Sequence, residues 1–244
     1  MLLRRFSKHV EDQNWFAVAL DFVIVVIGVF MGFQLNNWNE ARKLDIAYRE
    51  AQTRLISETR ANLSAVSTFM AQNEALLPDV RAAIDVLRRC GTSPTDEAAL
   101  LKGLQQIRGT MSLKLRMGVL DALTHDDGLL SRQTPAERER LSELFRTLSR
   151  SQETLDWLEQ LPFDSQVEDH PLIGFGEIEP VSVGGIELAS RKLTLAAPLA
   201  TACRDNAFAQ HFYIWERTAT FQNFRAAQVT QLLEETLQGM GAAP

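Results

Sequence analysis

Residues 15–38 read WFAVALDFVIVVIGVFMGFQLNNW, and this stretch decides how the chain is organised. Its apolar part covers 22 residues, from Phe16 to Asn37, which as a helix would be roughly 33 Å long. That length is sufficient to cross a hydrocarbon core of about 30 Å. Trp15 and Trp38 mark the two ends, where indole side chains prefer the headgroup layer. The stretch therefore predicts one transmembrane helix with two interfacial anchors.

A cleaved secretory signal is the alternative interpretation of this apolar stretch. The apolar part of a signal usually covers about 7–15 residues and is followed by small residues at the cleavage site. Here the run is longer and ends in Gln34, Asn36 and Asn37. We therefore expect an uncleaved anchor at 15–38, preceded by a short basic tail at 1–14.

Asp21 is the polar exception inside the predicted span. A carboxylate at mid-bilayer costs about 2.5–3.5 kcal/mol on insertion scales. At about 100° per residue, one side of the helix carries Asp21, Val25, Gly28, Gly32 and Leu35. Gly28 and Gly32 have the spacing that lets two membrane helices approach closely. We predict that this side, called the contact face below, binds another membrane helix, in a second copy or a different protein. A tolerated acid beside chance glycines is the alternative.

The same stretch resembles a family of bacterial single-span membrane proteins that has no assigned function. The resemblance rests on DFVIVVIG at 21–28, on Gln34 and on NNWNEARK at 36–43. A weaker likeness covers LDAL at 120–123 and GLL at 128–130, although THDD stands between them where the family often has Ser-Gly. The resemblance implies a membrane anchor with a mostly helical domain, and it carries over no catalytic residues.

Composition limits the partners of the remaining chain. The protein has 244 residues and a formal net charge of −6 at pH 7, so its bulk charge does not favour nucleic acid or an anionic bilayer surface. After the span, about 200 residues remain, which is enough for one medium-sized domain. The two cysteines, Cys90 and Cys203, could form a disulfide in an oxidising compartment or remain as two buried thiols.

The distribution of basic residues gives a preferred orientation. Arg4, Arg5 and Lys8 precede the span and favour a cytoplasmic N-terminus, while the bases that follow it, among them Arg42 and Lys43, nearly balance them. Long downstream domains cross regardless of charge, whereas a short basic tail resists export. We expect insertion in the bacterial inner membrane with the N-terminus in the cytoplasm and the C-terminal domain in the periplasm.

The rest of the chain predicts a helical-bundle domain at 39–238. No Pro or Gly occurs between Gly32 and Pro78, and an eleven-residue stripe runs through this segment, so the anchor should continue directly into a long helix. Pro78 suits the start of a further helix that Gly91 closes. Helices are also predicted after Ser93 and after the capping box at Thr134. Helical spacing also connects Leu113, Met117, Leu120 and Leu123.

The C-terminal third adds a hairpin and a closing helix. Two alternating runs across Gly184-Gly185 predict a small β-hairpin at about 181–188 that lies against the helices. A last helix is expected from Asp205-Asn206 to about Gly239, with a frayed tail at 239–244. Most of its aromatic residues follow the buried stripe. Three others lie off that stripe and hint at a second contact surface: Tyr213, Phe221 and Phe224.

Patterns typical of enzymes and metal sites are missing from the sequence. It contains no phosphate-binding glycine loop, no Cys-x-x-Cys, no His pair at i, i+4 and no nucleophile elbow. His125 with Asp126 and Asp127, and Asp169 with His170, are better explained as polar turn residues than as metal ligands. We therefore predict no catalytic residues, no metal and no cofactor.

These observations favour a non-enzymatic single-pass membrane protein whose helical domain interacts with or senses something unidentified. Its expected partners are membrane lipid and a second membrane helix at the contact face, which would produce a homo- or hetero-oligomer. We expect no binding of nucleic acid. Two alternatives from other classes remain. A lone acid near the start of a single span is similar in layout to a proton-driven stator subunit, in which Asp21 would carry protons. The other alternative is a divergent enzyme with an unrecognised site within 120–180.

Overall fold

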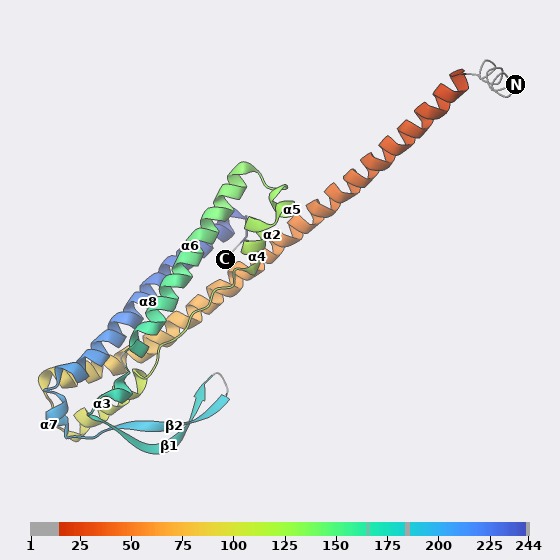
Figure 1. Ribbon diagram of the computed structural model, residues 1–244. Coiled ribbons are helices and arrows are strands. Elements are labelled where there is room, and N and C mark those ends of the chain that lie inside the picture. The colour runs from red at the N-terminus through yellow and green to blue at the C-terminus, as the bar shows by residue number, and fades with distance from the viewer. Residues whose placement is uncertain (1–14, 165, 184–185, 243–244) are drawn as a thin grey trace.

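The structure, a computed structural model, describes residues 15–164, 166–183 and 186–242. Its largest element is the helix α2 (Trp15–Arg89), which runs through 75 residues, or about 110 Å. Figure 1 shows the first part of α2 standing clear of the chain, whereas the remainder packs into a helical domain. The mainly α fold is confirmed, and the long apolar helix continues directly into the domain.

The prediction that Pro78 begins a new helix is wrong, because Pro78 lies inside α2. A proline inside a helix removes one backbone hydrogen bond. Leu77 and Val80, on either side of it, are buried in the domain, while Pro78 itself faces solvent. Packing of the neighbouring turns therefore holds the helix together through the proline.

The C-terminal end of α2 is a Schellman motif. The N–H of Gly91 donates to the carbonyl of Val86, and the N–H of Cys90 donates to that of Leu87, both at 3.3 Å. Cys90 takes the left-handed conformation of this motif, with φ at 53°. The sequence predicted that Gly91 closes the helix, whereas Cys90 takes the left-handed position. Glycine is needed at position 91 because space is short: a Cβ on Gly91 would lie 2.5 Å from the Asp96 carboxylate.

Two further long helices lie beside the domain part of α2 (Figure 1): α6 (Pro135–Gln160) and α8 (Asn206–Gly239). Both confirm the sequence prediction, and their buried positions are those of the predicted stripes. The capping box at Thr134 is half formed. Thr134 accepts the N–H of Glu137 at 3.2 Å, but the Glu137 carboxylate accepts a hydrogen bond from Gln52 of α2, at 2.9 Å.

The short elements connect these helices or cover their ends. In chain order they are α3 (Pro94–Gln106), α4 (Gly118–His125), α5 (Asp127–Leu130), the 3-10 turns η1 (Leu161–Asp164) and η2 (Val167–Asp169), and α7 (Leu199–Ala202). Helix α3 packs on the last turns of α2, and α4 and α5 lie at the opposite end of the domain, where α2 enters it (Figure 1).

The segment 109–117 forms no helix, although the spacing of Leu113 and Met117 with the leucines of α4 suggested one. Side-chain amides from two helices bind its backbone. Asn62 of α2 both donates to the carbonyl of Arg116 and accepts its N–H, each at 2.8 Å. Gln152 of α6 donates to one carbonyl of the segment at 2.9 Å and accepts an N–H two residues later at 2.8 Å. These contacts satisfy backbone groups that a helix would have paired internally.

The β-hairpin is longer than the predicted 181–188. Its strands β1 (Ile173–Val183) and β2 (Ile186–Leu195) are antiparallel and pair up to Val183 and Ile186; the predicted Gly184-Gly185 turn lies outside the described residues. The open end of the hairpin packs on α3, where Leu193 is fully buried and the Gln105 amide binds its backbone at 2.9 and 3.2 Å. Beyond that end the hairpin projects from the helices (Figure 1).

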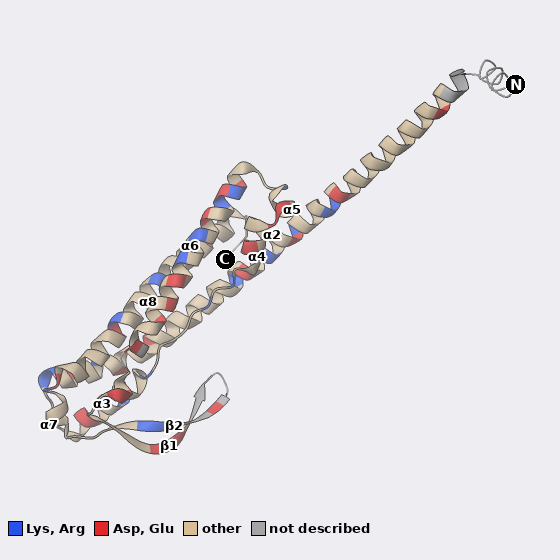
Figure 2. Cartoon of the chain, viewed as in Figure 1, with Lys and Arg blue, Asp and Glu red and all other residues tan. Residues whose placement is uncertain are grey.

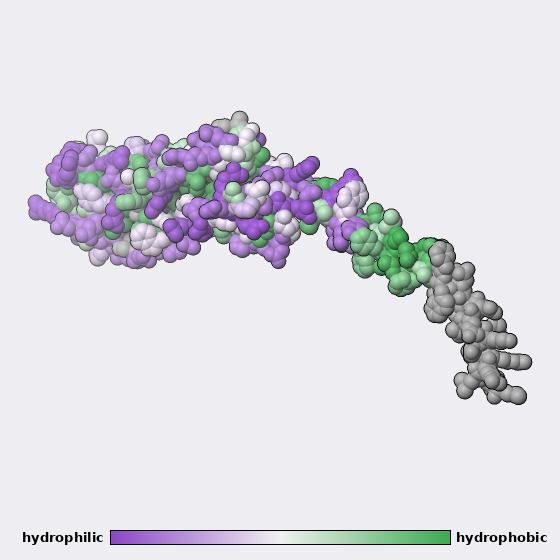
Figure 3. Space-filling view, turned by 90° about the horizontal axis from the view of Figure 1, so that it is seen from above, coloured by the Kyte–Doolittle hydropathy of each residue, from purple (hydrophilic) through white to green (hydrophobic). Residues whose placement is uncertain are grey.

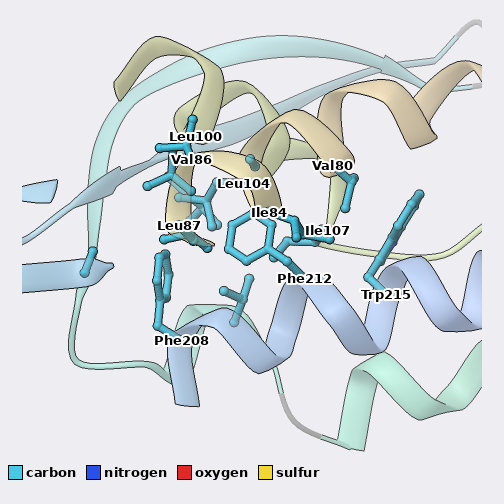
Figure 4. Packing of buried hydrophobic residues seen from close by; sticks show 14 of the residues in the cluster. Val80, Ile84, Val86, Leu87, Leu100, Leu104, Ile107, Phe208, Phe212 and Trp215 are labelled. Atoms are coloured by element: carbon cyan, nitrogen blue, oxygen red, sulfur yellow. The ribbon is translucent and has the colours of Figure 1, made fainter. Parts of the chain in front are cut away.

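The domain has two hydrophobic cores. The near core, beside the point where α2 enters, joins α2, α4, α6 and the C-terminal half of α8. The far core joins the last turns of α2 to α3, the hairpin, α7 and the first half of α8, with Phe208, Phe212 and Trp215 at its centre (Figure 4). Between them lie the buried polar side chains Asn73 and Gln222, whose amides are 3.4 Å apart.

Three carboxylates that accept hydrogen bonds from neighbouring groups have pKa values below the ordinary 3.8. Hydrogen bonds from Ser93 lower that of Asp96, the Lys114 ammonium lowers that of Asp156, and the N–H of the first turn of α8 lowers that of Asp205. A carboxylate with a lowered folded-state pKa adds stability above its unfolded pKa and loses it as the pH falls.

The domain should therefore lose thermal stability as the pH drops below about 4, where these carboxylates take up protons. Melting curves followed by circular dichroism between about pH 6 and 3 measure the slope. Replacing Asp205 and Asp96 by Asn removes two of the three titrating groups, so the double variant should show a lower melting temperature near pH 6 and a flatter pH dependence. An unchanged slope would contradict the assignment.

Candidate functional site: the exposed face of the N-terminal helix

The first part of α2 is long and apolar enough to cross a membrane. None of its most apolar stretch is buried within the chain. In Figure 3 this part forms a green segment beside the largely hydrophilic domain, and in Figure 2 it is almost free of charged residues. Within the described residues, α2 is the one helix that meets this description.

The five residues of the contact face are all exposed on this part of α2. They are Asp21, Val25, Gly28, Gly32 and Leu35. A Cβ added at Gly28 or Gly32 would meet no atom within 4 Å, so in the described chain nothing packs in this notch. No basic side chain within the described residues forms an ion pair with Asp21. The face therefore presents a carboxylate and a close-approach surface that no other described residue covers.

The unbroken course of α2 fixes this face relative to the domain. Eighteen residues make five helical turns, so residues 18 apart lie on the same side. From Gly28 this step leads to Ile46, Ser64 and Ala82, which are all exposed. From Phe30 it leads to Tyr48, Val66 and Ile84, which are all buried in the two cores. The contact face thus lies on the side of α2 that points away from the domain.

The two predicted interfacial tryptophans differ in what can be said of them. Trp38 is 64 % exposed, and the Arg42 guanidinium lies 5.9 Å from its ring centroid. Trp15 is the first residue of α2, but its side chain lies outside the described part of the chain. After Trp38 the helix becomes polar, and Asn36 donates to Glu40 at 3.2 Å.

Cys90 and Cys203 form a disulfide in the structure, with their Cα atoms 5.2 Å apart. It links the end of α2 to the end of α7, just before α8 begins. In the structure Cys90 is exposed and Cys203 is half-buried. The bond lies at the end of the domain farthest from the apolar part of α2.

The histidines that could have suggested metal sites have local partners. Nδ1 of His125 lies 3.0 Å from the carbonyl of Asp121 and from the hydroxyl of Thr124. Nδ1 of His170 accepts the N–H of Leu172 at 3.2 Å, and its Nε2 lies 3.6 Å from Asp205. The described residues hold no group of three His, Cys, Asp or Glu side chains placed to bind a metal ion.

The aromatic rings that lie off the buried stripe of α8 are exposed. A second contact surface on α8, which the sequence suggested, requires this exposure. Tyr213, Phe221 and Phe224 are 47, 54 and 56 % exposed. Sequence reasoning missed the neighbour of this surface, Trp157 of α6, which is 59 % exposed. Only the pairing of α6 with α8 places these rings on adjoining helices, and no local pattern predicts that pairing.

A comparison with known protein families, with curated proteins and with solved structures finds no match. The family resemblance of residues 21–43 therefore stays a prediction.

Proposed function

We propose that this protein is a non-enzymatic, single-pass membrane protein of the bacterial inner membrane, and that its contact face binds another membrane helix. The observation that carries the proposal is the unbroken helix α2, whose exposed contact face points away from the domain. A partner helix can pack there without meeting α6 or α8. In a second copy, paired in parallel, both domains would lie on the outside of the two α2 helices.

The chemistry at the far end of the domain supports the proposed orientation. Disulfides persist in the periplasm and are rare in the cytosol. The bond between Cys90 and Cys203 therefore supports a periplasmic domain and a cytoplasmic N-terminus. At about 1.5 Å per residue, α2 carries that end roughly 75 Å beyond Trp38. The domain would then present interaction surfaces well away from the bilayer.

Gly32→Ile should weaken the association, because its branched side chain fills the notch at Gly32, where no other atom lies within 4 Å. A bacterial membrane two-hybrid assay of the full-length chain measures self-association, with an expected signal loss of about tenfold. Ala19→Ile is the matched control, since Ala19 lies on the opposite side of the same helix. Equal signals from the two variants would argue against the contact face.

A proton-carrying role for Asp21 is separated from a structural one by Asp21→Asn in the same assay. Asn keeps the shape and a hydrogen-bonding group but cannot ionise. On our proposal, association persists in this variant or is the first property to fail. Full association together with complete loss of cellular function would instead favour the stator-like alternative.

A further inference from the structure

Helices α6 and α8 leave a groove between them on the solvent side of the bundle. Two hollows form it, of about 280 and 440 Å³, and both are lined by Thr147 of α6 and by Leu232 and Glu235 of α8. Because they share these residues, the two hollows adjoin each other along the helix pair. The core-facing side chains of α8, such as Ala226 and Leu233, are buried in the near core with residues of α2, and the groove opens on the other side of the helix.

The walls of the groove change in character along its length. Near the C-terminal end of α8 the lining is apolar, with Leu141 and Leu144 facing Leu232 and Met240. The middle is polar and includes Arg150 on α6 and Arg225 on α8.

Past the polar middle of the groove, the next turns of α6 and α8 carry exposed aromatic rings. Phe221 and Phe224 precede Arg225 by four and one residues on the same helix, and Trp157 follows Thr154 of the lining by less than one turn of α6. All three rings are more than half exposed. Large aromatic side chains at this exposure, next to arginine, are the residue types that dominate binding energy at protein interfaces.

The groove carries a surplus of positive charge on an acidic protein. Within the part of the chain that the structure describes, Arg140, Arg150 and Arg225 form no ion pair. The opposing acids are Glu143, which pairs with Arg146, and Glu235. The chain as a whole has a net charge of −6, so a second copy offers a less specific complement than a dedicated acidic segment.

We propose that an acidic amphipathic helix of a different protein packs into the α6–α8 groove. Its apolar face would contact the leucines at one end and the aromatic rings at the other, and its acidic flanks would pair with the arginines. From Arg140 to Trp157 the α6 wall covers about 26 Å, the length of a helix of about 18 residues. This proposal rests on the proposed interaction role of the domain and adds to it a binding surface and a class of partner.

A defined peptide tests the proposal with the full-length chain in nanodiscs of zwitterionic lipid. The probe is a fluorescent 18-residue amphipathic helix with Leu along one face and Glu on the other; its counterpart has Lys in place of Glu. Fluorescence anisotropy, corrected for empty nanodiscs, should show at least tenfold tighter binding of the Glu peptide. No binding of that peptide, or equal binding of both, would overturn the proposal.

Two variants locate the binding site. Phe221→Ala with Phe224→Ala should weaken Glu-peptide binding at least tenfold, and Arg150→Glu with Arg225→Glu should weaken it similarly and remove its salt dependence. The control, Phe175→Ala in the hairpin, removes an equally exposed ring and should leave binding unchanged. Loss of binding in the control alone would show that the peptide does not bind in the groove. A dimer in sedimentation that the groove variants abolish would show that the groove binds a second copy of the chain. Gly32→Ile should not affect the peptide assay, so its failure and that of the membrane contact are distinguishable.

Discussion

Loss of the disulfide should lower the free energy of unfolding of the full-length chain by about 5 kcal/mol. The bond joins residues with a sequence separation of 113, and the chain-entropy model gives about that value for a loop of this length. For a domain of about 200 residues, the melting temperature should fall by roughly 10–20 °C. Thermal unfolding of the Cys90→Ser and Cys203→Ser variants in detergent, followed by circular dichroism, measures the change.

The backbone at Cys90 provides an internal control. Its left-handed conformation costs a non-glycine residue about 1–2 kcal/mol, whereas glycine adopts it freely. With Cys203→Ser as background, Cys90→Gly should therefore be more stable than Cys90→Ser by about 1 kcal/mol. Wild-type protein treated with reductant should match the serine variants. Equal stability of reduced and oxidised protein would show that the bond does not hold α2 and α7 together.

The same two cysteines report the compartment of the domain. In intact cells, a periplasmic domain should contain the oxidised form, so a maleimide–polyethylene glycol reagent should shift its gel mobility only after reduction. Free thiols in untreated cells would contradict the proposed orientation without affecting the fold.

The parts of the fold that the sequence predicted are those with local signals. Helices α6 and α8 each have a capping residue, Thr134 and Asp205, followed by a regular apolar stripe. The apolar stretch of α2 needs no partner to identify it. The end of α2 was less predictable, because glycine is the usual residue at the left-handed closing position, and Cys90 occupies it one residue before Gly91. The bond between Cys90 and Cys203 is a contact between distant residues.

The errors occurred where tertiary contacts override local preference. Leu113 and Met117 have helical spacing with the leucines of α4, but Asn62 and Gln152 satisfy the backbone of 109–117 from two other helices. Pro78 resembles a helix start, but the packing of α3 against the following turns keeps α2 continuous. A single sequence contains neither kind of contact.

The candidate sites also have features that local pattern predicts and features that depend on the tertiary structure. Helical periodicity alone predicts that the five residues of the contact face share one side of α2, where they are all exposed, while their binding of another helix stays a prediction. The orientation of the contact face away from the domain could not be predicted, because it depends on an unbroken helical phase from Gly28 to Ala82. The α6–α8 groove was also beyond the sequence, which marked the exposed rings of α8 but did not show that Trp157 lies on the adjoining helix.

Gly103→Leu should destabilise the domain by about 3 kcal/mol or more, because Gly103 is the point where α3 touches α2. A Cβ at Gly103 would lie 2.5 Å from the Cβ of Ala83 and 2.8 Å from the carbonyl oxygen of Asp79, both on α2. A backbone carbonyl cannot rotate away as the end of a flexible side chain can. Forcing extra atoms into a packed contact typically costs about 1–3 kcal/mol, and leucine adds more than one methyl.

Gly103→Ala separates this clash from helix propensity. Alanine stabilises a helix interior by about 1 kcal/mol over glycine, so a free site would gain stability. Here the clash should exceed that gain, and denaturant unfolding should show a net loss of about 1–2 kcal/mol. Gly118→Ala, where the nearest atom lies 3.9 Å from the new Cβ, is the control and should be neutral or stabilising.

Ala83→Gly combined with Gly103→Ala completes the test. It removes the contact at 2.5 Å but leaves the Asp79 carbonyl at 2.8 Å, so it should restore only part of the loss. Because α3 supports the hairpin through Gln105 and Leu193, the Gly103 variants should also increase hydrogen exchange in β2. If Gly103→Ala proved as stable as the wild type, α3 would have to be displaced from α2, and the far core would need a different arrangement.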